Sequence, residues 1–279
     1  MIGTLRKFYR THIHSPALDR AIYTILDSLT ALLAKFYGFS FPDNYIRRWK
    51  LNMLWGIYEK ETYDLFKRII KPGMVVVDVG AHIGYFTRLF SKLVGNRGKI
   101  YAFEPDPENF GLLEKNTRRL KNVTTCKVAV SDAKKPMNFY RSEKTGCHSL
   151  VPDEARQREV ISVESVELDA FLVEKGETRV DLIKMDIEGG EMGAIRGARK
   201  TLSAPSICLV VEWNPSCQTQ AGFSQDALFR ELSSLGFKIF AIQKDTLLPV
   251  DPNSKNLPAE LLRETDFVNL FCMKQDLPS

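Results

Sequence analysis

The sequence predicts an α/β fold with a mostly parallel sheet covered by helices on both faces. From residue 74 onward, apolar segments of strand length alternate with segments of helical periodicity, which is typical of a parallel sheet. Residues 75–77 and 208–211 are unbroken apolar runs, as expected of strands buried on both sides. A glycine turn directly follows the first strand and leads into a helix.

Each element follows from its local pattern of apolar residues and turn signals. Strands are predicted at residues 74–79, 99–103, 123–130, 137–140, 160–166, 180–187, 207–213, 237–242 and 267–273. Helices are predicted at residues 44–58, from the glycine turn to about 94, and at 107–120, 168–175, 191–202 and 225–235. Ligands of such sheets bind beyond the carboxyl ends of the strands, so the residues that follow each strand are the candidate site.

A separate amphipathic helix is predicted in the N-terminal region. Its apolar residues recur at spacings of three and four and form one stripe: Ile22, Ile25, Leu26, Leu29, Leu32, Leu33 and Phe36. We expect this stripe to pack on the protein's own body or on a second subunit of a homodimer, and peripheral contact with a membrane is the less favoured alternative. The chain therefore divides into a helical extension, 1–57, which caps the site, contacts substrate or forms a dimer, and a domain at 58–279.

The composition is that of a soluble globular protein. Of 279 residues, 44% are hydrophobic and 26% are charged, which excludes a disordered, collagenous or disulfide-scaffold chain. The five cysteines are scattered without a CxxC pair, which predicts reduced thiols and a cytoplasmic location. The net charge of +5 is too small to imply a nucleic-acid partner. Residues 1–48, however, hold seven Lys and Arg against three Asp, which indicates an anionic partner, a membrane surface or simply a solvated helix face.

The glycine turn has the spacing acid-x-Gly-x-x-x-Gly, with Asp78, Gly80 and Gly84. A dinucleotide-binding turn has the spacing GxGxxG and places phosphate on a helix terminus, where a carboxylate such as Asp78 is unfavourable. The amino group and sulfonium of S-adenosylmethionine favour a nearby carboxylate. The turn therefore favours this cofactor, and the alternative is an ordinary tight turn between a strand and a helix.

Two later strand ends carry further acidic residues. Glu104 follows the second strand about 20–25 positions after the glycine turn, where an acid accepts hydrogen bonds from both ribose hydroxyls. Asp132 follows the third strand and either accepts the adenine amino group or serves as a turn residue. Together the three strand ends predict a nucleoside-bearing cofactor.

The order of these motifs resembles the FkbM family of S-adenosylmethionine-dependent methyltransferases. The resemblance rests on DVGAHIGYFT from Asp78, AFEPDPENF from Ala102, DLIKMDIEGGE from Asp181 and IRGA from Ile195, and it runs from about residue 58 to 213. It implies a class I methyltransferase (Rossmann-like) fold, usually with seven strands of which the last is antiparallel. It also implies O-methylation of a hydroxyl on a sugar, glycolipid, glycan or polyketide-like metabolite.

Carried over residue by residue, the resemblance places Asp78, Gly80 and Gly84 at the methionine end, Glu104 at the ribose and Asp132 at the adenine. His82 stands where the family more often has Asn, and Glu59 and Thr62 resemble an acidic-Thr lead-in that touches the cofactor. The residues predicted to bind the cofactor are Glu59, Thr62, Asp78, Gly80, Ala81, His82, Gly84, Tyr85, Glu104, Pro105, Ser131, Asp132 and Asp186.

The fourth long strand, at 180–187, carries the candidate catalytic residues. Strand alternation places Lys184, Asp186 and Glu188 on one face, where three ionisable side chains are hard to explain as core. Removing the proton of an acceptor hydroxyl requires a general base or a metal ion. The predicted catalytic residues are Lys184, Asp186, Glu188, Glu212 and, in a polar loop, His148.

Asp186, Glu188 and Glu212 would also suit Mg²⁺, although the resemblance leaves metal use open. Glu191 follows at a helix start, where it either belongs to the site or stabilises the helix N-terminus.

Several other activities fit the sequence less well. Amino-methylating enzymes show an Asn/Asp-Pro-Pro-aromatic turn after the fourth strand, and this chain has none there. Pyrimidine methylation by a cysteine nucleophile needs a Pro-Cys in the same region, which is also missing. The glycine spacing disfavours a nicotinamide dehydrogenase. An RNA ribose 2′-O-methyltransferase remains as an alternative that would use the basic N-terminus, and a non-catalytic cofactor-binding scaffold is the other.

Overall fold

The computed structural model describes residues 16–43, 45–142, 157–244, 246–252, 262 and 266–275. The chain forms two compact units, one that ends at Tyr58 and one that begins at Glu59, and each is described by itself. In the described part of the chain, no helix is both long enough and apolar enough to cross a membrane.

The first unit contains two helices, α2 (Pro16–Phe36) and α3 (Arg47–Leu54). Arg47 joins them, because its guanidinium lies 2.8 Å from the Asp27 carboxylate and over the Tyr23 ring. Thr30 and Ala34 are buried on the same flank of α2. The helix predicted at 44–58 is shorter than expected, since α3 covers only Arg47–Leu54. It packs against a flank of α2 that is separate from the apolar stripe.

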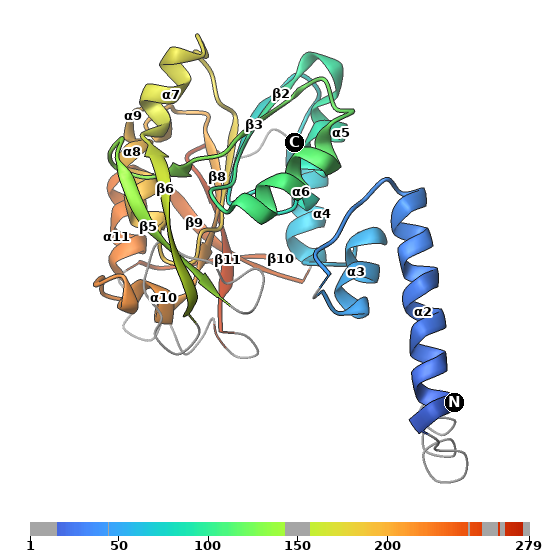
Figure 1. Cartoon of the computed structure of the whole chain (residues 1–279). Helices are drawn as coiled ribbons and strands as arrows, with labels where there is room; N and C mark the ends of the chain where they lie inside the picture. The colour runs from blue at the N-terminus through green and yellow to red at the C-terminus, as the bar shows by residue number, and fades with distance from the viewer. Residues whose placement is uncertain are drawn as a thin grey trace. The chain divides into compact units, whose positions relative to one another are not determined.

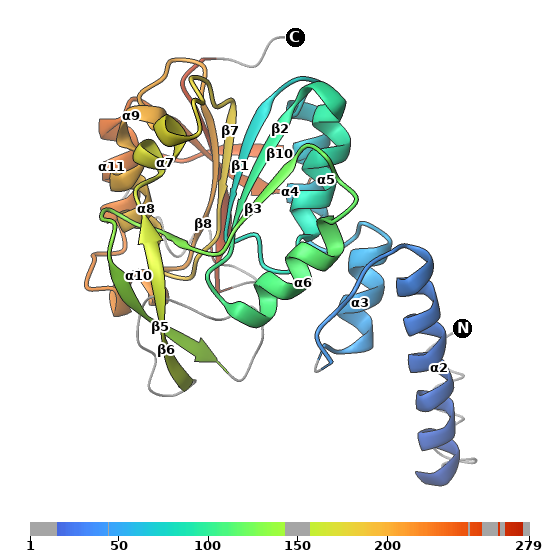
Figure 2. The same ribbon diagram turned by 45° about the horizontal axis from the view of Figure 1, so that its top comes forward.

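An eight-stranded sheet forms the frame of the second unit, with the strand order β10-β9-β11-β8-β7-β1-β2-β3 (Figures 1 and 2). Its strands are β1 (Val75–Val79), β2 (Lys99–Phe103), β3 (Val123–Cys126), β7 (Leu182–Met185), β8 (Cys208–Trp213), β9 (Lys238–Gln243), β10 (Thr246–Pro249) and β11 (Val268–Met273). From β3 to β8 all neighbours are parallel, whereas β11 pairs antiparallel with both β8 and β9. The predicted α/β fold with a late antiparallel strand is confirmed.

The sheet has eight strands where the resemblance implied seven. The additional strand is β10, which pairs antiparallel with β9 at the sheet edge. Its sequence, TLLP, is short and largely exposed, so it carries little of the apolar pattern on which the prediction depended.

Helices cover both faces of the sheet (Figure 1). One face carries α4 (Lys60–Ile69), α5 (Tyr85–Val94) and α6 (Pro107–Thr117), and a short η1 (Gly95–Arg97) follows α5. The other carries α7 (Leu168–Glu174), α8 (Glu191–Gly197), α9 (Arg199–Leu202) and α11 (Ala227–Ser234). Sequence analysis did not predict α4. A second helix without a sequence-based prediction is α10 (Pro215–Gln220), which the Asn214 side chain caps.

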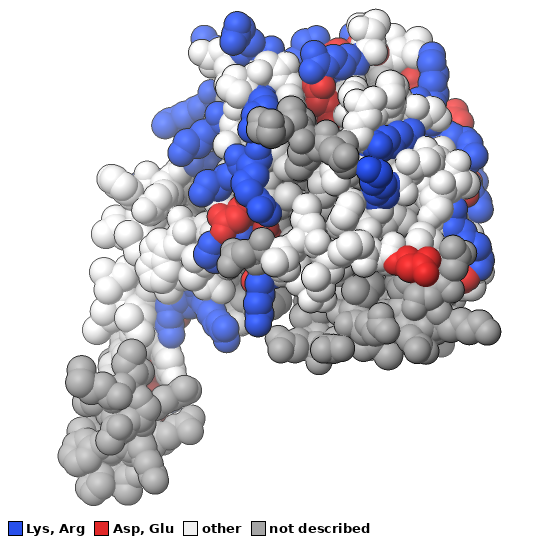
Figure 3. Space-filling model, turned by 180° about the vertical axis from the view of Figure 1, so that it is seen from behind, with Lys and Arg blue, Asp and Glu red and all other residues white. Residues whose placement is uncertain are grey.

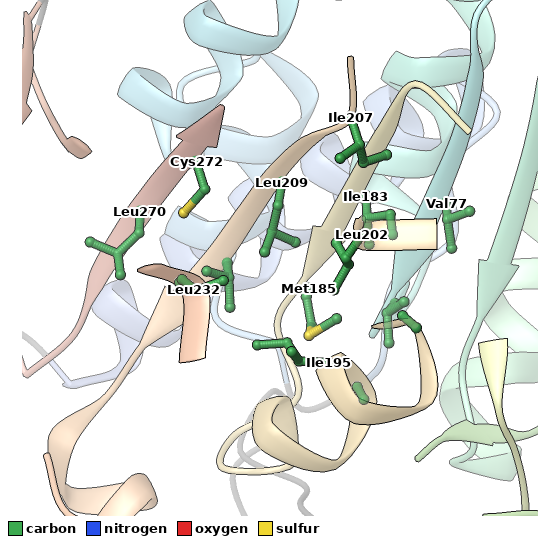
Figure 4. Packing of buried hydrophobic residues seen from close by; sticks show 14 of the residues in the cluster. Val77, Ile183, Met185, Ile195, Leu202, Ile207, Leu209, Leu232, Leu270 and Cys272 are labelled. Atoms are coloured by element: carbon green, nitrogen blue, oxygen red, sulfur yellow. The ribbon is translucent and has the colours of Figure 1, made fainter. Parts of the chain in front are cut away.

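Alternation along the strands divides their side chains between the two faces. Val77, Ile183, Leu209 and Leu270 come from four neighbouring strands and belong to one buried cluster with residues of α8, α9 and α11 (Figure 4). The intervening positions of the same strands point to the face that α4 and α5 cover. This division places the polar residues of β1, β7, β8 and β11 together on the second face.

Three predicted elements differ from the observed ones in ways that affect the site. The strand predicted at 123–130 is two strands, β3 and β4 (Ala129–Val130), and β4 belongs to a separate three-stranded sheet with β5 (Pro136–Ser142) and β6 (Gln157–Val166). The strand predicted at 180–187 ends at Met185. The helix predicted at 191–202 breaks at Ala198, which separates α8 from α9.

Candidate active site

Four polar residues meet where the parallel strands end and β11 begins. Asp78 of β1 stands in register with Lys184 of β7, and Glu212 of β8 stands in register with Asn269 of β11. All four alternate with members of the buried cluster on the opposite face, so they point to the side of α4 and α5. This sheet edge is where an α/β protein binds its ligand.

The glycine turn after β1 is closely packed against the end of β7. Gly80 has a φ of +79°, and a Cβ atom at this position would lie 1.9 Å from the carbonyl oxygen of Asp186. Asp78 is fully buried and accepts a 2.6 Å hydrogen bond from the Thr87 hydroxyl of α5. Burial raises the pKa of Asp78, and the charge of Lys184 opposes this increase. Gly80 is thus required both by its backbone conformation and by the close approach of a second strand.

Glu104, at the end of β2, links the two adjacent turns. Its carboxylate accepts hydrogen bonds from the backbone N–H of His82 and of Asp106, both at 2.9 Å. Burial raises the pKa of Glu104 to about 8, although the hydrogen bond from Asp106 lowers it. His82 has a φ of +53°, a left-handed conformation in which Asn, Asp and His are enriched. A His at this position therefore suits a backbone conformation that an Asn also adopts readily.

The predicted adenine-side residues lie against α8. Ser131 is buried, and Asp132, which follows β4 instead of the third strand of the main sheet, is exposed. A Cβ atom at Gly193 would lie 3.3 Å from the Ser131 hydroxyl oxygen, and one at Gly197 would lie 1.9 Å from the Ser131 carbonyl oxygen. The glycines of α8 thus allow this helix to approach Ser131 closely.

Lys184 lies buried among carboxylates. Its ammonium group is 3.1 Å from the Asp186 carboxylate and 4.0 Å from that of Asp78, and it donates to the Gly80 carbonyl at 3.4 Å. Burial alone lowers the pKa of Lys184, but attraction to Asp186, Asp78 and Glu59 outweighs it and raises the net pKa. Lys184 therefore keeps its proton at neutral pH and cannot serve as a general base.

Asp186, Glu188 and Glu212 form a carboxylate cluster in which one oxygen of each residue lies within 4.8 Å of the others. The prediction that alternation along one strand aligns Lys184, Asp186 and Glu188 is wrong, because β7 ends at Met185. Asp186 and Glu188 instead lie in the loop that follows, where Glu188 has a φ of +51°. The loop, and not the strand, brings the carboxylates together with Glu212 of β8.

Glu212 is the most buried carboxylate of the cluster, with 7% of its surface exposed. No described residue donates a hydrogen bond to it or forms an ion pair with it. Burial, followed by repulsion from Asp186 and Glu188, raises the pKa of Glu212 well above its usual value. A carboxylate in this state readily takes up a proton or a cation.

Glu191 stabilises the loop after β7 through hydrogen bonds with the loop backbone. Its carboxylate accepts hydrogen bonds from the backbone N–H of Ile187 and Gly189 and from the Gln218 amide of α10. Burial raises the pKa of Glu191 to about 7, and the backbone hydrogen bonds lower it. Of the two roles considered for Glu191, these contacts support a structural one, which includes the loop as well as the start of α8.

Asn269 is a residue of the site that sequence analysis missed. Its side-chain amide donates to the Glu59 carboxylate at 3.0 Å and to the Thr62 hydroxyl at 3.1 Å. Asn269 thereby holds the start of α4 at the sheet edge, next to Glu212. One signal was available, since Asn269 is the single polar residue in the apolar run VNLFCM.

The remaining predicted residues lie around the turns, at the start of α4 or outside the described part of the chain. Ala81, Tyr85 and Pro105 are buried around the turns after β1 and β2. Tyr85 begins α5, and burial raises its pKa. His148 lies outside the described residues. The structure thus brings Glu59 and Thr62 near the carboxylates, and the cofactor roles of all these residues stay predictions.

Three curated proteins with sequence similarity carry methyltransferase names. They are the 2-O-methyltransferase NoeI of Sinorhizobium fredii (30% identity, over 48% of this chain and 60% of that protein), the 31-O-demethyl-FK506 methyltransferase FkbM of Streptomyces tacrolimicus (28%, 46% and 60%) and the hexuronic acid methyltransferase AglP of Haloferax volcanii (25%, 58% and 64%). The chain thus spans about three fifths of the length of the curated relatives it matches.

Solved structures are similar at a greater distance. A crystal structure of methyltransferase FkbM from Methylobacillus flagellatus has 15% identity and a TM-score of 0.46, covering 90% of this chain and 60% of that one. The sequence model of the protein family named methyltransferase FkbM domain matches residues 78–239, which is more than half of the chain. The resemblance on which the sequence analysis relied is therefore confirmed, and the chain belongs to the FkbM methyltransferase family.

Proposed function

We propose that this protein is an S-adenosylmethionine-dependent O-methyltransferase that acts on a hydroxyl of a sugar or glycan. The observation that carries the proposal is the carboxylate cluster of Asp186, Glu188 and Glu212 directly beside the glycine turn. The names of two relatives, a 2-O-methyltransferase and a hexuronic acid methyltransferase, support oxygen as the acceptor atom and a sugar as its carrier.

The residues present fit the cofactor. The methionine end would lie at the turn after β1, where the carboxylate of Asp78 suits a ligand with a positive charge. Both oxygens of Glu104 accept a backbone hydrogen bond, and each retains a lone pair for a ribose hydroxyl. When bound, the cofactor supplies a methyl group activated by its sulfonium.

The chain's contribution to methyl transfer is to position the acceptor oxygen and to remove its proton. The cofactor, held by residues of the turns after β1 and β2, would supply the methyl group to the acceptor oxygen and keep the electron pair of the methyl–sulfur bond. The hydroxyl proton passes to a carboxylate of the cluster, and Glu212 is best suited because its pKa is raised by burial. Lys184 stays protonated and orients Asp186 through their 3.1 Å ion pair.

The same three carboxylates also fit a divalent cation, since Mg²⁺ prefers carboxylate oxygens and water. Asp186, Glu188 and Glu212 would hold it, and when bound it would lower the pKa of the acceptor hydroxyl. The metal and the general base then compete for one role. Activity that survives EDTA would assign the role to Glu212, whereas activity that returns with Mg²⁺ would assign it to the ion.

The first test is calorimetric titration with S-adenosylhomocysteine, with NAD as the negative control, each with and without Mg²⁺. The second is transfer of a labelled methyl group to a panel of hydroxylated glycans, polyketides and RNA.

Asp186→Asn and Glu212→Gln should each lower turnover by at least about 100-fold. The control Glu61→Gln replaces an exposed carboxylate of α4 and should leave turnover unchanged. Absence of S-adenosylhomocysteine binding in a folded sample would contradict the proposal.

A further inference from the structure

The apolar stripe of α2 is exposed in the structure. It consists of side chains whose exposed fractions run from 37% to 83%: Ile22, Ile25, Leu26, Leu29, Leu32, Leu33 and Phe36. The partner helix α3 does not cover it, because α3 contacts the flank of Tyr23 and Asp27. Figure 3 shows the surface of α2 on the viewer's side as mostly uncharged.

We propose that the first unit binds the surface of an anionic lipid bilayer, with α2 lying in the interface and its apolar stripe in the acyl region. A 21-residue helix with a wide apolar face and a separate polar face is the form of an interfacial helix. No described helix is able to span the membrane, so the inferred contact is peripheral.

The net charge of the protein favours an anionic bilayer over other occupants. Residues 1–58 contain eight Lys and Arg and three Asp, a net charge of +5, whereas residues 59–279 contain 31 basic and 31 acidic residues and are neutral. All of the net charge thus belongs to the unit that carries the exposed stripe. A second copy would bring the same positive charge to the interface, while anionic headgroups are complementary to it.

Exposed aromatic side chains provide a second argument for a bilayer. Phe36, Tyr37, Trp49 and Trp55 are 83%, 45%, 40% and 58% exposed, and all belong to the first unit. Amphipathic rings of Trp and Tyr favour the level of the lipid headgroups. An apolar stripe, aromatic rings and excess positive charge on one small unit together fit an anionic membrane surface.

The test is flotation of the full-length protein with vesicles of phosphatidylcholine alone or with 30% phosphatidylglycerol. We expect binding to the anionic vesicles that weakens with salt. The double variant Leu29→Glu/Leu32→Glu should lower the partition coefficient by at least about tenfold, since two leucines no longer enter the bilayer. The matched control Thr24→Glu/Ser28→Glu adds the same charge to exposed positions of the same helix, outside the stripe.

Three outcomes would overturn the proposal. Equal losses in both double variants would mean that charge alone mediates binding. A dimer in light scattering that only the leucine variant dissociates, without vesicle binding, would assign the stripe to a second copy. A fall in melting temperature of the leucine variant alone, again without vesicle binding, would mean that the protein's own body covers the stripe. Vesicle binding is measured without cofactor or acceptor, so its result is independent of the proposed methyl transfer.

Discussion

At the scale of single residues, Glu104 links the turn after β1 to the start of α6 through its two accepted hydrogen bonds. Burial raises its pKa to about 8, so the free protein holds it mainly protonated at neutral pH. A ribose diol donates to carboxylate oxygens and therefore favours the ionised form. Binding of the cofactor and loss of this proton are expected to be coupled.

We predict that the affinity for S-adenosylhomocysteine increases as the pH rises toward 8 and is constant above it. Below pH 8, the affinity should fall by up to about tenfold for each pH unit, because ionising Glu104 then costs free energy. Calorimetric titration at pH 6, 7, 8 and 9 measures the effect. Glu104→Ala should bind weakly and without this pH dependence, and an unchanged affinity would show that the ribose assignment is wrong.

A second prediction concerns Asn269, which donates to both Glu59 and Thr62. Asn269→Ala removes two partly buried hydrogen bonds and should lower the free energy of unfolding by about 1–3 kcal/mol. Asn269→Asp should cost more, because it adds a negative charge beside the Glu59 carboxylate. Urea denaturation at pH 7.5 gives both values. Asn138→Asp, at an exposed position of β5, is the control with an expected change below about 0.5 kcal/mol.

At the scale of elements, α8 is held close to the turn after β4 by its glycines. A Cβ atom at Gly197 would lie 1.9 Å from the Ser131 carbonyl oxygen, and this backbone atom cannot move without shifting the strand. Gly197→Ala should therefore destabilise the protein by at least about 2 kcal/mol.

Gly111 in α6 is the matched control for this substitution, because a Cβ atom there would meet nothing within 4 Å. Gly111→Ala should stabilise the protein by about 0.5–1 kcal/mol through the higher helix propensity of alanine. Melting temperatures of the two variants are the measurement. Equal effects of both substitutions would contradict the argument from close packing.

The loop after β7 is the element where the geometry predicted from the sequence is wrong. Strand alternation was extended to Asp186 and Glu188, but the strand ends at Met185, before either residue. Glu191 then determines the path of the loop through the backbone N–H groups of Ile187 and Gly189, and Gln218 of α10 orients Glu191. Such contacts depend on how α8 and α10 pack, and no local pattern reports them.

At the scale of the whole molecule, the buried carboxyl groups determine how stability depends on pH. The pKa of Glu191 is raised to about 7 and that of Glu104 to about 8, and Glu212 is raised as well. The folded state therefore binds more protons than the unfolded state between about pH 4.5 and 8. The stabilisation is complete below the unfolded pKa and is lost as the pH rises through the folded values.

We predict that the free energy of unfolding of the ligand-free protein is higher at pH 5.5 than at pH 9. Each unit by which folding raises a pKa corresponds to a change of about 1.4 kcal/mol in the free energy of unfolding between the two pH values. Lys184 contributes little to this difference, because its raised pKa keeps it charged in both conditions. Urea denaturation at pH 5.5, 7 and 9 measures the slope, and stability that increases with pH would contradict these shifts.

The sequence by itself determined the fold class, the family and the identity of most candidate residues. Buried parallel strands must be apolar throughout, and the residues that follow them face the ligand edge, so Asp78, Glu104 and Asp186 could be selected from position alone. His82, which stands where the family more often has Asn, adopts a left-handed backbone conformation in which both residue types are enriched.

Tertiary structure alone decided how these residues meet. The register of β11 against β8 places Asn269 beside Glu212, and the closeness of the β1 turn to the end of β7 explains why position 80 must be glycine. It also decided that Lys184 stays charged, because its pKa depends on carboxylates from three separate segments. Such contacts join residues far apart in the chain, and local periodicity carries no information about them.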